Sequence, residues 1–199
     1  MDIQCHSVYG NHVFFIKKGI RMIFCIQASN PEFKEMKNPD DNSLAEAIES
    51  VFSMNTEYAI MMWEHICIPL SYKYDVSYMI DDVLKLLEMM QNEISGKTIV
   101  HWLPDTFRCD WQVEWAGGTV HIFSKWECTV GHLENLLNCH NYISLSVAEF
   151  ISEWKKVLGI VINGLECAGY GQEELDGMFE LVNRYETIEK AGVLYRESY

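Results

Sequence analysis

Positive charge is scarce in this sequence. Lysine and arginine supply 15 residues against 29 aspartates and glutamates, which leaves a formal net charge of −14 at pH 7. A surface this acidic repels phosphate backbones and anionic membranes, so we expect no direct binding to nucleic acid. The charge favours either solubility alone or a basic protein partner that complementary charge steers into place.

Long hydrophobic runs are also missing. No uninterrupted apolar stretch approaches the roughly 18 residues of a membrane-spanning helix, and Met1–His6 has neither the basic region nor the apolar core of a signal peptide. The seven cysteines are irregularly spaced, and several lie in apolar runs such as Ile23–Ile26. Cysteines of this kind act as small buried hydrophobes in a reducing compartment. We therefore expect a cytoplasmic protein that does not cross a membrane.

Signatures of catalysis or cofactor binding are absent too. The glycines of Ala168–Gly171 follow a helical pattern, whereas a dinucleotide-binding loop must follow a strand. Cysteine and histidine are the ligands that zinc prefers, but there is no Cys-x-x-Cys pair, and adjacent Cys139 and His140 rarely bind one ion together. We expect no metal and no cofactor. The alternative is a small cytosolic enzyme with a site assembled from scattered Cys, His and acidic residues, for which the first candidates are Cys128, His132 and Cys139.

Apolar and aromatic residues are plentiful. They make up 49% and 13% of the chain, respectively, which is too much for a disordered protein. At 199 residues, the chain fits one globular domain over 1–199 with a substantial core.

Two hairpins are predicted. Val13–Ile16 and Ile20–Ile26 flank a short turn that contains Gly19. The second hairpin spans 109–126 around Gly117-Gly118, a two-residue turn that matches strand twist. Its register predicts three pairs on one face and two oppositely charged or polar pairs on the other. These pairs are Trp115 with Val120, Val113 with Ile122, Trp111 with Ser124, Glu114 with His121, and Asp110 with Lys125.

Helical periodicity appears in three long segments, at 76–94, 147–168 and 173–188. A shorter helix follows a predicted capping box at Ser43–Glu46, and the longest follows a second box at Ser146–Glu149. The apolar stripe of the last helix consists of Leu175, Met178, Phe179, Val182 and Tyr185. Strands are also predicted at 58–63, 66–74 and 97–102, and Pro69 places the second of these at an edge or a bulge. The fold class is α+β, an antiparallel or mixed sheet built on two hairpins with amphipathic helices packed against it.

The start of the longest helix carries a resemblance. A Trp-containing hairpin is followed, in this small acidic chain, by Ser146-Val147-Ala148-Glu149-Phe150-Ile151-Ser152-Glu153-Trp154. In size, charge and this segment, the chain resembles bacterial immunity proteins, the cytosolic antidotes of contact-dependent and other polymorphic toxin systems. Many of those proteins block nuclease toxins. The resemblance implies a non-catalytic protein that binds a toxin directly.

Acidic side chains gather in two segments that we expect to bind the basic partner. The first is the outer face of the helix at 173–188, and the second is the polar loop between Ser29 and Asn42. The alternative is that these groups only solvate the surface. The candidate binding residues are Glu173, Glu174, Asp176, Glu180 and Glu186 in the helix and Asp40 and Asp41 in the loop.

Overall fold

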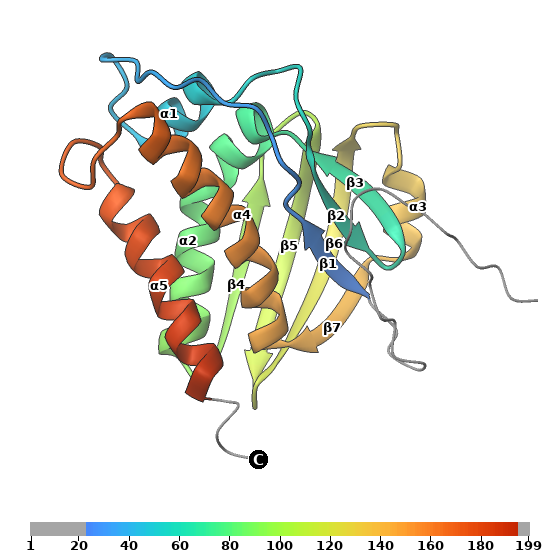
Figure 1. The fold of residues 1–199 in the computed structure, drawn as a ribbon. Helices are drawn as coiled ribbons and strands as arrows, with labels where there is room; N and C mark the ends of the chain where they lie inside the picture. The colour runs from blue at the N-terminus through green and yellow to red at the C-terminus, as the bar shows by residue number, and fades with distance from the viewer. Residues whose placement is uncertain (1–22, 195–199) are drawn as a thin grey trace, which may run out of the picture.

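A computed structural model describes the backbone of residues 23–194 and the side chains of residues 23–188. Figure 1 shows its helices and strands. In chain order they are β1 (Phe24–Gln27), α1 (Leu44–Val51), β2 (Ala59–Trp63), β3 (Ile66–Leu70), the π-helix η1 (Tyr72–Val76), α2 (Ser77–Asn92), β4 (Ser95–Trp102), β5 (Phe107–Ala116), β6 (Thr119–Thr129), α3 (Glu134–Cys139), β7 (Tyr142–Ser146), α4 (Val147–Ala168) and α5 (Met178–Leu194).

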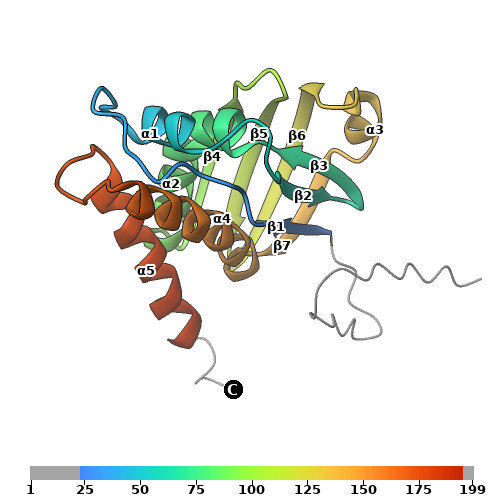
Figure 2. The same ribbon diagram turned by 45° about the horizontal axis from the view of Figure 1, so that its top comes forward.

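The strands form two antiparallel sheets, in the orders β1-β2-β3 and β4-β5-β6-β7. Helices α2 and α4 lie across one face of the four-stranded sheet, and α5 packs against both helices (Figure 1). The three-stranded sheet lies on the same face, with β1 beside α4 (Figure 2). The α+β class is confirmed, but the described strands form two sheets: β1 lies in one, and the hairpin of β5 and β6 lies in the other.

The second hairpin is confirmed residue by residue. All five predicted pairs are observed between β5 and β6. Gly117 and Gly118 have φ values of +57° and +76°, the left-handed region that this tight turn requires and that only glycine adopts without cost. Only the register shift between Arg108 and Cys109 was not predicted.

Most of the first hairpin lies outside the described residues. Its second strand is present in part as β1, which pairs with β2 from Phe24 to Gln27. The segment 13–22 is not described. Within 23–194, β3 lies at an edge of its sheet, as predicted, and Pro69 pairs there with Ile60. The predicted strand at 66–74 is too long, because it ends at Leu70 and Tyr72–Val76 form the π-helix η1, which Ser71 caps.

Both predicted helix starts are present. At α4, Ser146 Oγ accepts a hydrogen bond from the Glu149 amide, and Glu149 accepts one from the Ser146 amide, which completes a capping box. At α1, Ser43 caps the helix in the same way, but Glu46 accepts from the Asn42 amide instead. Helix α4 ends at Gly169, whose φ of +96° is typical of a left-handed cap.

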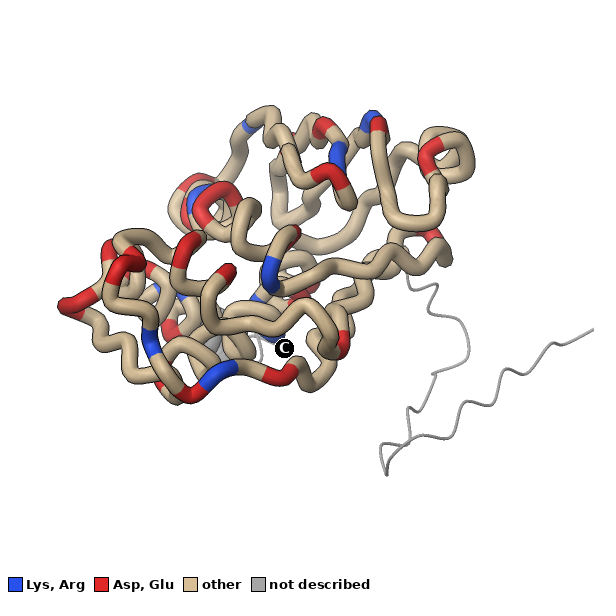
Figure 3. Tube along the Cα trace, turned by 90° about the horizontal axis from the view of Figure 1, so that it is seen from above, with Lys and Arg blue, Asp and Glu red and all other residues tan. Residues whose placement is uncertain are grey.

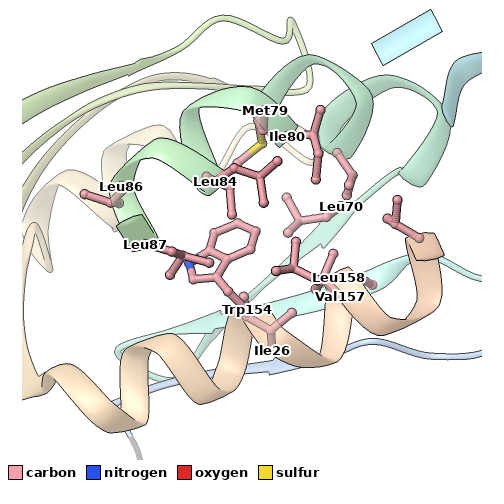
Figure 4. Close-up of a cluster of buried hydrophobic side chains, with 14 of the residues drawn as sticks. Ile26, Leu70, Met79, Ile80, Leu84, Leu86, Leu87, Trp154, Val157 and Leu158 are labelled. Carbon is pink, nitrogen blue, oxygen red and sulfur yellow. The ribbon is translucent and has the colours of Figure 1, made fainter. Parts of the chain in front are cut away.

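The core is rich in tryptophan. Trp63 of β2 lies 5.4 Å from Trp111 and 5.5 Å from Trp126, measured between ring centroids. Trp102 meets Trp111 edge to face at 5.1 Å. From α4, Trp154 points toward Leu84 and Leu87 of α2 (Figure 4). These contacts join both sheets and two helices in one apolar cluster.

Gly164 provides a test of how tightly α4 packs. A Cβ atom there would lie 2.7 Å from Cζ of Phe52, which is buried and stacked on Tyr72. Gly164→Ala should therefore lower the free energy of unfolding by roughly 1–3 kcal/mol, although alanine is the better helix former.

Gly159 is the matched control in the same helix, because its added Cβ would meet only the Tyr185 ring, at 3.2 Å. We expect Gly159→Ala to change stability by less than about 1 kcal/mol. Urea denaturation measures the free energy of unfolding of both variants. Equal values would show that Phe52 does not pack tightly against Gly164 of α4.

Candidate functional site

The structure brings the two acidic segments together. Asp41 and Asn42 of the loop after β1 face residues 172–177, which connect α4 to α5, across a hollow of about 410 Å³. Figure 3 shows acidic positions at the left of the trace, where the connection before α5 lies. Phe179 completes the rim. We call this the acidic hollow, defined by Asp41, Asn42, Gln172, Glu173, Glu174, Leu175, Asp176, Gly177 and Phe179.

The predicted helix at 173–188 begins too early. Helix α5 starts at Met178, so Glu173, Glu174 and Asp176 lie on a turn instead of a helical face. The cause is tertiary. Gly177 has a φ of +85°, outside the helical region, and Leu44 packs so closely on it that a Cβ atom would lie 2.9 Å from Leu44 Cδ1. Asp176 also forms an isolated parallel bridge with Ser43.

Glu180 and Glu186 do lie on α5, and both are exposed. Glu180 is 3.9 Å from the guanidinium of Arg184, which is almost fully buried and also binds Glu88 at 3.2 Å. This contact directs Glu180 toward α2. The five acidic residues therefore do not form the single helical surface that their spacing predicts.

Asp41 has a structural role at the hollow. Its carboxylate accepts hydrogen bonds from the Tyr170 hydroxyl, the Ser50 hydroxyl and the Asn38 amide. Burial raises the pKa of Tyr170, and the neighbouring Asp41 carboxylate raises it further. The phenol therefore stays protonated and holds the loop against the end of α4.

The remaining carboxylates differ in their partners. Glu174 binds Lys37 at 2.7 Å, and this contact lowers the pKa of Glu174. No described residue forms an ion pair or side-chain hydrogen bond with the carboxylate of Glu173, Asp176 or Asp40. These three exposed groups are available to an outside cation.

An exposed phenylalanine stands beside them. The side chain of Phe179 is 66% exposed, although the sequence predicts it in the apolar stripe of α5. That prediction is wrong because the buried apolar positions of α5 are Met178, Leu181 and Ile188, a face turned away from Phe179. A stripe built on those three positions would have placed Phe179 outside.

The Cys–His residues do not converge. Among the residues described, no three His, Cys, Asp or Glu side chains lie where they could hold a metal ion. Cys128 is on β6, His132 in the following turn, and Cys139 at the end of α3. The expectation of core thiols fails for Cys139 and likewise for Cys67 and Cys167, which are exposed. Among the six cysteines that the structure describes, only Cys109 is buried.

Asp75 is the most enclosed carboxylate described. It is 1% exposed, and burial raises its pKa. One oxygen accepts a 2.7 Å hydrogen bond from the Ser71 amide, and the other accepts from the Thr106 hydroxyl. Both oxygens are thus occupied in joining η1 to the β4–β5 loop, which assigns Asp75 a structural role.

None of the helices in the described part of the chain is long and apolar enough to cross a membrane. The chain matches no protein-family model, and neither a curated protein nor a solved structure shows significant similarity to it.

Removing the Tyr170 hydroxyl tests how the hollow is held. Tyr170→Phe leaves the ring packed but deprives Asp41 of one donor, so we expect a loss of about 1 kcal/mol in unfolding free energy. Tyr78→Phe is the control, because Tyr78 is 65% exposed on α2. Chemical denaturation that shows no difference between the two variants would contradict this role.

Asp75→Asn should change how stability depends on pH. Asparagine can accept from the Ser71 amide and donate to the Thr106 hydroxyl, so both hydrogen bonds can persist. Since folding raises the pKa of Asp75, the stabilising protonated state is fully present below the unfolded pKa and is lost as pH rises through the folded pKa.

The wild type should therefore lose stability relative to Asp75→Asn as pH rises from acid toward neutral. Denaturation curves at a series of pH values measure the difference. A difference that stays constant or shifts toward the wild type would contradict the buried-charge argument.

Proposed function

We propose that this chain is a non-catalytic antidote that binds a basic toxin domain, of the nuclease type, at the acidic hollow. The proposal rests on one observation above the rest. The hollow brings the unpaired carboxylates of Glu173 and Asp176 beside an exposed aromatic ring, Phe179. This arrangement suits a partner that offers lysine or arginine next to an apolar surface.

Charge supports the same partner. Nuclease domains hold phosphate chains and are typically basic, so a chain with a net charge of −14 attracts them over several ångströms. Complementary charge raises the association rate more than it raises affinity. Fast association is what an antidote requires, since it must capture a toxin before the toxin cleaves its substrate.

The carboxylates of the hollow have two different roles. Asp41 and Glu174 already have partners in the chain, so they shape the surface. Glu173 and Asp176 can accept a partner's cations without losing an internal contact. Phe179 would supply the apolar anchor, because a large ring that leaves water contributes more than rim charges do.

The proposed place of action is the cytoplasm, where a nuclease toxin meets its substrate. The likeness of residues 146–154 to bacterial immunity proteins supports the same interpretation. A catalytic role has less support, because the candidate Cys and His residues lie apart and the enclosed Asp75 is fully hydrogen bonded.

The test uses the protein encoded directly upstream of this gene, the usual position of a toxin gene. The C-terminal domain of that protein is purified with an inactivating substitution. Surface plasmon resonance then measures its rate of association with this chain at several salt concentrations. The variant Glu173→Lys, Asp176→Lys should associate about tenfold more slowly or worse and show weaker salt dependence.

The matched control carries the same change in net charge elsewhere. It reverses Asp82 and Glu93, which are exposed and outside the hollow. A specific site predicts a much smaller effect for this control. Equal effects of the two variants would leave only a general charge contribution, and a wild-type chain that fails to bind or inhibit the upstream protein would refute the antidote.

A further inference from the structure

The outer face of the four-stranded sheet is bare in the described part of the chain. Helices α2 and α4 and the three-stranded sheet all lie on the opposite face (Figures 1 and 2). Three large side chains lie in one cross-strand row of this face, Ile99 on β4, Phe123 on β6 and Tyr142 on β7, with Gln112 of β5 between the first two; they are 52%, 48% and 40% exposed. Phe123 and Tyr142 lie 4.6 Å apart between ring centroids.

The charges on this face balance, unlike those of the whole chain. Three cations and three carboxylates flank the apolar row, and most of them pair with each other. Lys97 binds Glu114, and Lys125 binds Glu127 at 2.9 Å. His101 lies 2.6 Å from Asp110. The balanced set is Lys97, Arg108 and Lys125 with Asp110, Glu114 and Glu127.

A neutral, partly aromatic face does not suit the basic partner of the acidic hollow. Aromatic side chains are enriched in protein interfaces, and a face whose charges balance can be complementary to a copy of itself. We infer that this sheet face joins two copies of the chain in a symmetric dimer.

The charge pattern favours a second copy and selects its orientation. With a two-fold axis parallel to the strands, between β5 and β6, each residue of β5 faces its own β6 partner in the other copy. Asp110 then meets Lys125, Glu114 meets His121, and Arg108 meets the β6 segment that carries Glu127. An axis across the strands would instead place Asp110 on Glu114 and make like charges repel.

The area is sufficient for a modest dimer. Four strands spaced about 4.8 Å apart and up to about eight residues long cover roughly 500 Å² of sheet in each copy. The two copies together bury about 1,000 Å², near the lower bound for a specific interface. We therefore expect a dimer that dissociates at micromolar concentrations.

Dimerisation would leave the acidic hollow open, because loop 40–42 and the connection before α5 do not contribute to the sheet face. The dimer is thus independent of the antidote proposal, and either one can fail without the other.

The experiment measures the oligomeric state of the full chain by sedimentation equilibrium over a range of micromolar concentrations. The wild type should show a reversible monomer–dimer equilibrium. Phe123→Glu should weaken it at least tenfold, whereas Tyr78→Glu, at a comparably exposed position on α2, should not.

A charge exchange tests the orientation. Asp110→Lys alone places lysine against Lys125 of the other copy, and Lys125→Asp alone places aspartate against Asp110, so each variant should dimerise less than the wild type. An equimolar mixture should restore dimers, because each contact then joins lysine to aspartate. Circular dichroism confirms that both variants fold.

A wild type that stays monomeric throughout the range would refute the dimer. A dimer that Phe123→Glu does not affect would place the interface elsewhere, and a mixture that fails to restore association would exclude this orientation. If either charge variant fails to fold, comparing the dimerisation of Phe123→Glu with that of Tyr78→Glu still tests whether the interface lies on the sheet face.

Discussion

The contact between Trp63 and the second sheet holds the two halves of the molecule together. Its ring is fully buried between Trp111 and Trp126, and its indole N–H donates a 2.7 Å hydrogen bond to the His140 carbonyl, just before β7. A buried tryptophan contributes a large apolar area, and truncating one typically costs about 3–5 kcal/mol. The same residue therefore sets the distance between the sheets and fixes the approach to the edge strand.

That contact also determines where the acidic hollow forms. Beside Trp63, Phe24 stacks on Phe150 at the start of α4, with 5.3 Å between ring centroids. Helix α4 then runs past Phe52 to Tyr170, whose hydroxyl holds Asp41 in place. One wall of the hollow is thus tied to the core through α4, which packs on Phe24 near its start and on Phe52 near its end. A rigid wall favours binding, since less conformational entropy is lost when a partner docks.

Local rules account for much of the fold. The β5–β6 register follows from the alternation of side chains and the Gly-Gly turn, because a slip by one residue would expose every buried side chain. The start of α4 follows from Ser146 and Glu149 in the same way. The division into two sheets could not be predicted, because periodicity tells which face of a strand is buried and not which element covers it.

The site was only half predictable for the same reason. Its carboxylates were found from their density in the sequence, but the approach of Asp41 to Asp176 depends on the packing of Leu44 against Gly177, a tertiary contact. The helical period runs through 173–188, and the local sign of a later start is Asp176-Gly177, a turn pair directly before Met178. The exposure of Phe179 has a tertiary cause, because α5 packs through Met178, Leu181 and Ile188 and not through the face that the periodicity predicts.

The two surfaces proposed for binding differ in how their charges are satisfied. On the sheet face, the carboxylates lie across from cations on neighbouring strands, since cross-strand pairing favours opposite charges. In the hollow, Glu173 and Asp176 lie on a turn, where no neighbouring strand supplies a partner. Most charges of the sheet face therefore have a partner within the chain, whereas on the turn Glu174 binds Lys37 and Glu173 and Asp176 stay available. A chain with an excess of acid can in this way present one face suited to its own copy and another suited to a basic partner.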